Sequence, residues 1–255
     1  KIDYVDLPLA DPSKKEDVSY ETIHICFPFV YEPIFKEEVK QYMELYKPKL
    51  TVIHSTVPPG TTRSIGGHVV YSPVNGRHPD LTKSIKTFVK FIGGVDPSDT
   101  FNAAMFFQQA GISTMVFSSP ESVEVAKVLC TTHLAWDVIF MKEVIKICAQ
   151  YNVPFHEVYT DWNAYYNQGY NKLEEQRFLR AVLFPFAGPI GGHCVIPNLE
   201  FIDTWLTKFV KEKNDEYKNL ASGETQHPSG GEDRKQLHNP QPRVDRKRRG
   251  HRKQR

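Results

Sequence analysis

The feature that most constrains the fold of this chain is a strand–helix–strand pattern close to its first residue. Residues 22–28 form an apolar, β-branched run that ends at Pro28, and residues 50–55 form a second such run. Between them, residues 32–46 carry apolar side chains at helical spacing. Such a unit implies a parallel sheet with a right-handed crossover. Loops at the carboxyl ends of its strands line the ligand crevice, so Pro28, Ser55 and Thr56 are the first candidates for ligand binding.

Further patterns complete a two-part architecture. Apolar runs predict more strands in the first part, and helical spacing dominates after Ser119, with a long helix that is apolar over more than one stripe. The expected elements are strands at 68–73, 88–94 and 114–117 and helices at 99–109, 120–151, 154–169, 173–182 and 200–216. The sequence therefore predicts an α/β fold, in which an incomplete Rossmann-like parallel sheet (residues 1–117) precedes an all-helical domain (residues 118–218).

The last segment, residues 219–255, differs from the rest in composition and is expected to be a disordered basic tail. From Ala221 to Arg255 there are ten lysines and arginines against four acidic residues, so this part carries +6 while the rest sums to about −4. The tail could bind nucleic acid or direct nuclear import, but a solvated terminus is the favoured interpretation. The remainder gives no electrostatic reason to expect a nucleic-acid partner.

The cysteines and the hydropathy pattern indicate the cellular compartment in which this protein is expected. The four cysteines (Cys26, Cys130, Cys148 and Cys194) are widely spaced, which fits neither a zinc site nor a disulfide scaffold, so no metal is expected. No apolar run has the length of a membrane span, and no signal-peptide pattern is present. We therefore expect a cytoplasmic protein with no membrane partner. Because the chain begins at Lys1 rather than Met, an upstream piece is expected to be missing.

A glycine-rich stretch, residues 188–198, contains the strongest candidate for chemistry. Cys194 directly follows His193, and Gly191 and Gly192 make the backbone permissive. An adjacent imidazolium would raise the thiolate fraction of Cys194 and make it a nucleophile. The alternative is a tight turn with an inert cysteine. Earlier in the chain, Arg77 could hold a phosphate or carboxylate, or could be a solvated loop residue.

Four stretches, in this order, resemble the nucleotide-sugar dehydrogenases of the UDP-glucose and UDP-N-acetylmannosamine type, within the 6-phosphogluconate-dehydrogenase-like superfamily. They are Thr51–Thr62, then Ser72-Pro73 with Ile92-Gly93-Gly94, then Val123–Lys127, and finally Gly191–Cys194. The resemblance covers roughly residues 20 to 215.

This resemblance implies an enzyme that oxidises a sugar or nucleotide-sugar alcohol with NAD or NADP. It implies that Cys194 is the nucleophile and Lys127 stabilises charge on oxygen, with His193 beside them. Ser55 and Thr56 would lie next to the nicotinamide, and Arg77 would bind substrate phosphates. By the same resemblance, the helical domain would bind substrate and form a homodimer.

The sequence also departs from the family pattern. The Gly-x-Gly-x-x-Gly element is absent, Thr131 and Lys142 stand where the family has asparagines, and Asn198 stands where it has a carboxylate. Because the basic tail is not expected to fold, a second, C-terminal Rossmann domain is expected to be missing too. A two-electron oxidation is therefore favoured over full oxidation to an acid. The alternative is a non-catalytic relative that binds a nucleotide or nucleotide sugar, or acts as a dimeric scaffold.

Overall fold

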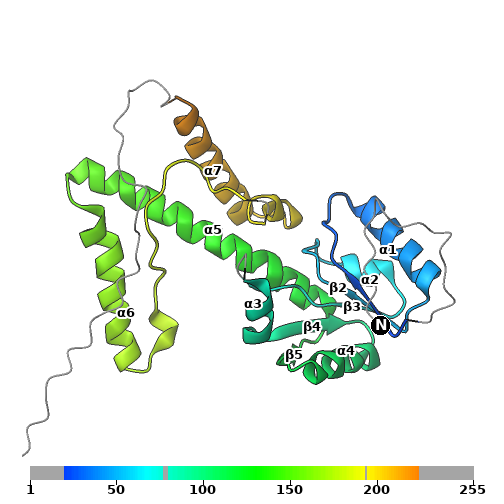
Figure 1. Cartoon of the computed structure of the whole chain (residues 1–255). Coiled ribbons are helices and arrows are strands. Elements are labelled where there is room, and N and C mark those ends of the chain that lie inside the picture. The colour runs from blue at the N-terminus through cyan, green and yellow to red at the C-terminus, as the bar shows by residue number, and fades with distance from the viewer. Residues whose placement is uncertain (1–19, 77–79, 193, 224–255) are drawn as a thin grey trace, which may run out of the picture.

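The computed structural model describes residues 20–76, 80–192 and 194–223. Arg77, His193 and most of the expected basic tail lie outside these residues. The described chain contains a sheet layered with short helices at one end and a long helix, α5, that leads to a helical part (Figure 1).

The sheet contains five strands in sequence order, β1 (Thr22–Ile25), β2 (Leu50–Ile53), β3 (Val69–Tyr71), β4 (Lys90–Gly94) and β5 (Thr114–Val116). The pairs β1–β2, β2–β3 and β4–β5 are parallel, whereas β3 and β4 are antiparallel. The predicted α/β class is confirmed, but the expectation of a wholly parallel sheet is wrong at this one pair. The segment between β3 and β4 returns to the sheet at the end where β3 stops, so that Lys90 begins β4 next to Ser72 and the two strands run in opposite directions.

Helices cover both faces of the sheet. They are α1 (Glu32–Tyr46), α2 (Thr61–Ile65), α3 (Leu81–Thr87) and α4 (Pro97–Gln109). One core cluster joins Ile25 and Ile53 to Phe35 of α1 and Val123 of α5, and a second joins Val52 and other strand residues to Phe107 of α4. Alternation along the strands thus divides the apolar residues between two faces.

The long helix α5 (Pro120–Tyr151) begins directly against the sheet. Its N-cap is Ser119, whose hydroxyl accepts a hydrogen bond from the Ser122 amide. Gly93 of β4 allows this approach, because a Cβ at that position would lie 2.5 Å from the Ser119 carbonyl oxygen and 2.8 Å from the Cα of Pro120. The start of α5 is therefore fixed over β4.

Beyond the sheet, α5 packs against a π-helix (His156–Asp161), a 3-10 helix (Pro197–Phe201) and α7 (Trp205–Gly223). The π-helix leads into α6 (Trp162–Lys172), which contacts a 3-10 helix at Gln176–Phe178. In Figure 1, α7 runs alongside α5 and α6 lies at its far end. The predicted helix at 173–182 is wrong: residues 179–184 lie alongside α6, where Asn167 and Asn163 bind the backbones of Arg180 and Ala181. The expected helix at 200–216 begins later, at Trp205.

Candidate functional site

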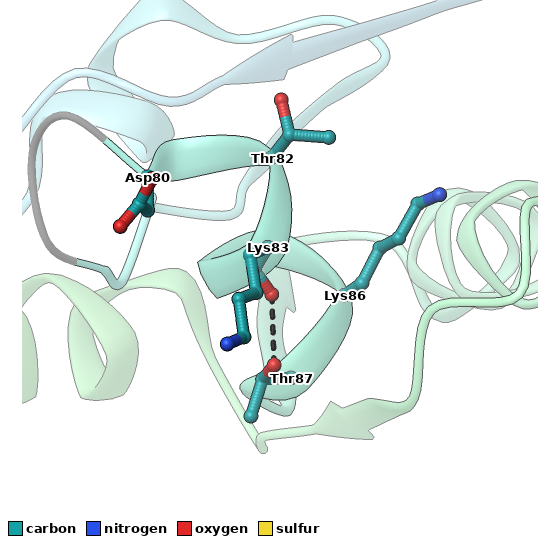
Figure 2. A pocket seen from close by; sticks show the side chains of 5 residues that line it. All are labelled: Asp80, Thr82, Lys83, Lys86 and Thr87. Atoms are coloured by element: carbon teal, nitrogen blue, oxygen red, sulfur yellow. Dashed lines mark hydrogen bonds between the residues drawn. The ribbon is translucent and has the colours of Figure 1, made fainter.

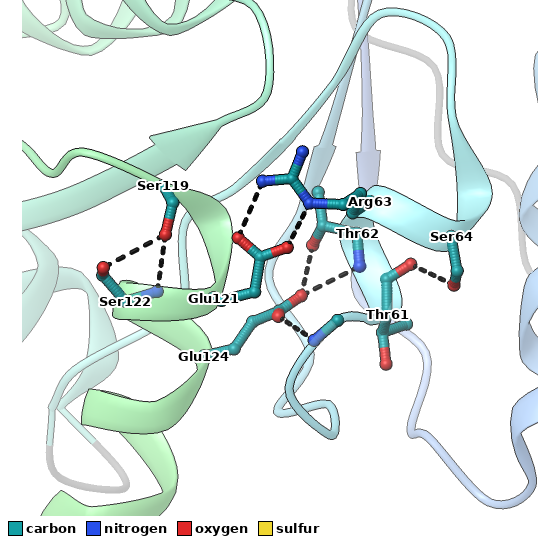
Figure 3. Close-up of polar contacts among 9 residues, drawn as sticks. Thr61, Thr62, Arg63, Ser64, Ser119, Glu121, Ser122 and Glu124 are labelled. Atoms are coloured by element: carbon teal, nitrogen blue, oxygen red, sulfur yellow. Dashed lines mark hydrogen bonds and ion pairs between the residues drawn. The ribbon is translucent and has the colours of Figure 1, made fainter.

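A buried carboxylate connects the start of α5 to the loop that follows β2 (Figure 3). Glu124 is fully buried and accepts hydrogen bonds from the Gly60 amide at 2.6 Å, the Thr62 amide at 2.9 Å and the Thr62 hydroxyl at 2.6 Å. One turn earlier, Glu121 pairs with Arg63 at the surface, and this guanidinium lowers the pKa of Glu121 to about 2. These contacts fix the Ser55–Gly60 loop relative to α5.

The loops after β1 and β2 meet at the carboxyl edge of the sheet. The Ser55 hydroxyl donates to the Phe27 carbonyl, so Ser55 and Pro28 lie on adjoining loops, with the half-buried Thr56 next to them. The ring of Phe29, next in the first loop, contacts Phe201 with the centroids 5.2 Å apart. The segment that follows Cys194 therefore reaches back to the edge of the sheet.

Lys127 lies one turn after Glu124, at the same edge. Its ammonium donates to the Val74 carbonyl at 2.8 Å and to the side-chain oxygen of Asn75 at 3.3 Å. Burial lowers the pKa of Lys127, and the thiolates of Cys130 and Cys194 act in the opposite direction. The residues that follow Cys194 pack against α5, the helix that carries Lys127, although Lys127 and Cys194 are far apart in sequence. Asn75 also belongs to this group, a role that the sequence analysis did not assign.

The glycine-rich stretch is held open to solvent around Cys194. Gly191, Gly192 and Cys194 are exposed, and a Cβ at either glycine would meet no other atom within 4 Å. Gly192 nevertheless has φ +91°, a conformation that L side chains rarely adopt. The buried Asn198 side chain donates to the Cys194 carbonyl oxygen. His193 and Arg77 are outside the described residues, but the backbone at Asn75 and Gly76 leads toward Arg77 from the side of Lys127.

A second polar cluster lies beside this edge and was not expected from the sequence. The buried ammonium of Lys90 donates to the carbonyls of Ser72 at 2.9 Å and Pro73 at 3.2 Å, and lies 3.2 Å from Nδ1 of His54. His54 in turn approaches His24, with 2.9 Å between ring nitrogens. Burial lowers the pKa of Lys90 to about 8 and lowers those of both histidines. The sequence analysis assigned no role to His24, His54 or Lys90.

A shallow hollow of about 520 Å³ adjoins α3 and is lined by Asp80, Thr82, Lys83, Lys86 and Thr87 (Figure 2). All of these side chains come from α3 or its N-cap, and Thr87 donates to the Lys83 carbonyl at 2.8 Å. Neither Lys127, Asn75 nor Cys194 lines this hollow.

Neither a metal centre nor a membrane-spanning helix is found within residues 20–76, 80–192 and 194–223. No group of three or more histidine, cysteine, aspartate or glutamate side chains is arranged to hold a metal ion. Within the same ranges, no helix combines the length and the apolar character needed to cross a membrane. The four cysteines are free thiols, and Cys148 alone among them is buried.

Known proteins resemble this chain in sequence and in structure, although no family model matches it. The UDP-N-acetyl-D-mannosamine dehydrogenase of Methanococcus vannielii is 24% identical over 220 residues, which are 83% of this chain and 43% of that protein. The enzyme of the same name from Methanocaldococcus jannaschii is 24% identical over 186 residues, 70% of this chain and 38% of that protein. These relatives are nucleotide-sugar dehydrogenases. The resemblance predicted from the four motifs is confirmed, and the chain spans about two fifths of the length of these relatives.

Solved structures give the same result for the fold. The UDP-D-ManNAc dehydrogenase of Pyrococcus horikoshii matches with a TM-score of 0.64 and 18% identity, over 80% of this chain and 52% of that one. The NDP-N-acetyl-D-galactosaminuronic acid dehydrogenase of Methanosarcina mazei matches with a TM-score of 0.60 and 20% identity, over 80% of this chain and 50% of that one. The Rossmann-like fold of this chain is thereby established.

Proposed function

We propose that this chain is part of an NAD(P)-dependent dehydrogenase that oxidises an alcohol of a sugar or nucleotide sugar. The observation that supports the proposal is the meeting of the Ser55 and Pro28 loops with Lys127 at the carboxyl edge of the sheet, to which the segment after Cys194 returns through the contact of Phe201 with Phe29. Ligands of open α/β sheets bind at this edge. The names of the similar proteins give the substrate class.

The side chains can perform covalent capture of an aldehyde. The Cys194 thiolate would attack the carbonyl carbon, and the electron pair of the C=O bond would move to oxygen, giving a thiohemiacetal alkoxide. Lys127 has three N–H donors, and among the described residues Val74 and Asn75 accept two of them. The third would stabilise the alkoxide by a charge-assisted hydrogen bond and supply its proton. His193 is proposed to lower the proton affinity of the neighbouring thiol, and Arg77 to bind substrate phosphates.

The residues present fit one end of a dinucleotide. Pro28, Ser55 and Thr56 lie on two loops that adjoin at the carboxyl edge, as a nicotinamide site requires. When bound, the nicotinamide supplies the hydride acceptor. Among the described residues, β1 pairs only with β2, and no glycine-rich turn opens a helix toward the pyrophosphate. The choice between NAD and NADP therefore stays open in this proposal.

A second candidate function is a non-catalytic relative that binds a nucleotide or nucleotide sugar, or serves as a dimeric scaffold. Asn198 favours it, because this side chain is buried and donates its amide to the Cys194 carbonyl, where the family resemblance implies a water-activating carboxylate. The same observation limits the first candidate to a two-electron oxidation that ends at the aldehyde.

The proposal extends to assembly and location. We assign cofactor binding to residues 1–117 and substrate binding and homodimer formation to residues 118–218, in a cytoplasmic protein. The exposed apolar side chains Leu129, Phe140 and Ile147, whose spacing places them on one face of α5, support the dimer, because exposed apolar surface on soluble proteins commonly marks interfaces. Sedimentation as a monomer at tens of micromolar would contradict it.

The proposal is tested first by binding of NAD and NADH, measured by calorimetry on this chain and on any form extended upstream. Binding only by an extended form supports a dehydrogenase of which this chain is one part, and binding by neither form favours the scaffold. In the form that binds, the Cys194→Ser variant should lose aldehyde capture while keeping ligand affinity. Cys130→Ser is the matched control, since Cys130 is also coupled to Lys127 but is not the proposed nucleophile. Equal capture by Cys194→Ser and the parent chain would remove the nucleophile assignment.

A further inference from the structure

The stretch that carries Cys194 has few regular hydrogen bonds of its own, so its position depends on other elements. Residues 179–192 contain no helix or strand, and Gly191 and Gly192 are exposed. A segment with an irregular backbone must have its carbonyl and amide groups bound by side chains or by water. The side chains that bind this backbone therefore set where Cys194 lies.

Two buried polar side chains perform this role, one from each of the two long helices of the helical part. Lys142 of α5 is 3% exposed, and its ammonium donates to the carbonyls of Phe186 at 2.9 Å and Gly188 at 2.7 Å. Asn214 of α7 is 5% exposed, and its side-chain oxygen accepts the Ile190 amide at 2.6 Å.

The environment of Lys142 fixes its ammonium in this place. The ring of Phe186 lies 3.9 Å from Nζ and that of Tyr217 lies 5.1 Å away, so the charge faces two aromatic rings as well as two carbonyls. Tyr217 is itself held by a hydrogen bond to Glu143 at 2.8 Å. An ammonium that is buried without a carboxylate partner is costly, and it is retained where several oriented dipoles replace water. Here those dipoles belong to the glycine-rich stretch.

We propose that Lys142 and Asn214 are positioning residues that clamp the backbone of residues 186–190 and thereby set the position of Cys194 relative to α5, the helix that carries Lys127. The clamp acts on three backbone groups within five residues, immediately before the exposed glycines. On the other side of Cys194, Val195 and Ile196 pack against the cluster that contains Ala135 and Ile139 of α5. Cys194 is therefore anchored on both sides to the helix that carries Lys127. This inference rests on the proposed function only in taking Cys194 as the nucleophile.

The test measures the coupling of Lys127 to Cys194 by thiol alkylation, which requires neither cofactor nor substrate. Iodoacetamide labelling of each cysteine is followed by peptide mass spectrometry in the parent chain, Lys127→Met, Lys142→Met and the double variant. In the parent background, Lys127→Met removes a positive charge and should slow the labelling of Cys194 by about fivefold. A change of this size is typical of a partly exposed pair of charges. In the Lys142→Met background, where the clamp is lost, the Lys127→Met substitution should slow the labelling of Cys194 by less than about 1.5-fold. The reason is that the interaction between the ammonium and the thiolate weakens as their separation grows.

Cys130 and Cys148 are internal controls that distinguish release of the stretch around Cys194 from misfolding of the whole protein. Cys130 belongs to α5 itself, so its dependence on Lys127 should be unchanged in Lys142→Met, whereas a misfolded chain would lose it and expose the buried Cys148. Lys142→Arg keeps a cationic donor and should restore coupling at Cys194. At the second anchor, Asn214→Asp keeps the oxygen that accepts the Ile190 amide, and Asn214→Leu removes it. Coupling should persist in the first of these variants and fall in the second.

The outcomes distinguish this inference from the proposed function. If Lys127→Met slows labelling of Cys194 equally with and without Lys142, while Cys148 stays protected, the clamp is refuted. If Asn214→Leu behaves like Asn214→Asp, the second anchor is refuted. If Lys127→Met has no effect on Cys194 even in the parent chain, the catalytic pairing of Lys127 with Cys194 fails, and with it the position that the clamp would serve.

Discussion

Burial of Lys90 should make the stability of this protein depend on pH in the alkaline range. The ammonium is 7% exposed, and burial lowers its pKa from 10.5 to about 8, with the neighbouring charges of Cys26 and Lys127 making smaller contributions of opposite sign. The folded state therefore releases this proton more readily than the unfolded state. Below pH 8 both states hold the proton, and folding bears the full cost of burying the charge. Stability should rise as the pH increases from 8 to 10.5.

The size of the pH-dependent change in the free energy of unfolding follows from the difference in the pKa of Lys90 between the folded and unfolded states. A difference of about 2.5 pKa units corresponds to about 3 kcal/mol between the two limits, of which about 2 kcal/mol should be gained between pH 7 and pH 10. The assay is urea unfolding of the parent chain and of Lys90→Met at a series of pH values, compared as the difference in free energy of unfolding. This difference should grow in favour of the parent by about 2 kcal/mol over that range.

The substitution also leaves the carbonyls of Ser72 and Pro73 without their donor, which costs about 1–3 kcal/mol at every pH. That term moves the whole curve and does not change its slope. The matched control is Lys83→Met, because Lys83 is an exposed lysine of α3, and its curve should run parallel to that of the parent. A parent-minus-Lys90→Met difference that is flat from pH 7 to pH 10 would refute the reasoning.

Three further predictions concern single positions and are checked by urea unfolding. Glu124→Gln keeps the shape of the side chain but removes the charge that accepts from Gly60 and Thr62, and should lower the free energy of unfolding by about 2–3 kcal/mol; an unchanged midpoint would contradict this. Gly93→Ala should cost about 1–3 kcal/mol, because the new Cβ meets backbone atoms at the start of α5, whereas the open Gly169 offers a control in which alanine is tolerated. Gly192→Ala should cost about 1 kcal/mol through its φ of +91°, although no atom lies within 4 Å; a neutral effect would mean that the loop adopts another conformation in solution.

Local patterns were sufficient to predict the two principal helices. The expected bounds at 32–46 and 120–151 match α1 and α5 residue for residue. Both have a proline in the first turn, and both end at a residue with left-handed backbone, Lys47 or Asn152, so that periodicity and termini agree. Where a tertiary contact decided the outcome, the prediction failed. Residues 179–184 have helical propensity, but the side chains of Asn163 and Asn167 on α6 bind their backbone in an extended form.

The direction of β4 could not be predicted for a different reason. Side chains alternate with a period of two in either direction, so the run at residues 88–94 is equally compatible with parallel and antiparallel pairing. The direction is set by the path of the chain between Tyr71 and Lys90, including the short helix α3, which the sequence analysis did not predict. This path places Lys90 at the carboxyl end of β3, next to Ser72, where it forms the buried cluster.

In the candidate site as well, residues that belong to sequence motifs could be predicted, whereas contacts between distant parts of the chain could not. Lys127, Cys194 and Ser55 could be named from sequence because each belongs to a short stretch that resembles a family motif. The contacts of Asn75, Glu124 and Lys142 could not be predicted, although Glu124 lies in one of those stretches and Lys142 was noted as a departure from the family pattern. Each of these side chains binds a group that is between 44 and 64 residues away in sequence. A carbonyl group has no sequence signature, and the partner of a polar side chain that binds one is visible only in the fold.

Lys142 and Asn198 show why departures from a family pattern need to be judged in the structure. From sequence alone, both positions suggest loss of function, because polar groups expected for the complete oxidation are replaced. In the fold, both side chains are buried, and both bind backbone carbonyls of the stretch that carries Cys194. A carboxylate at position 198 would face the Cys194 carbonyl oxygen without a donor between them, which is unfavourable in a buried site. The amide at this position is thus consistent with the local backbone, and the two replacements have a shared structural effect: they order the loop around the thiol while removing the group that would activate water.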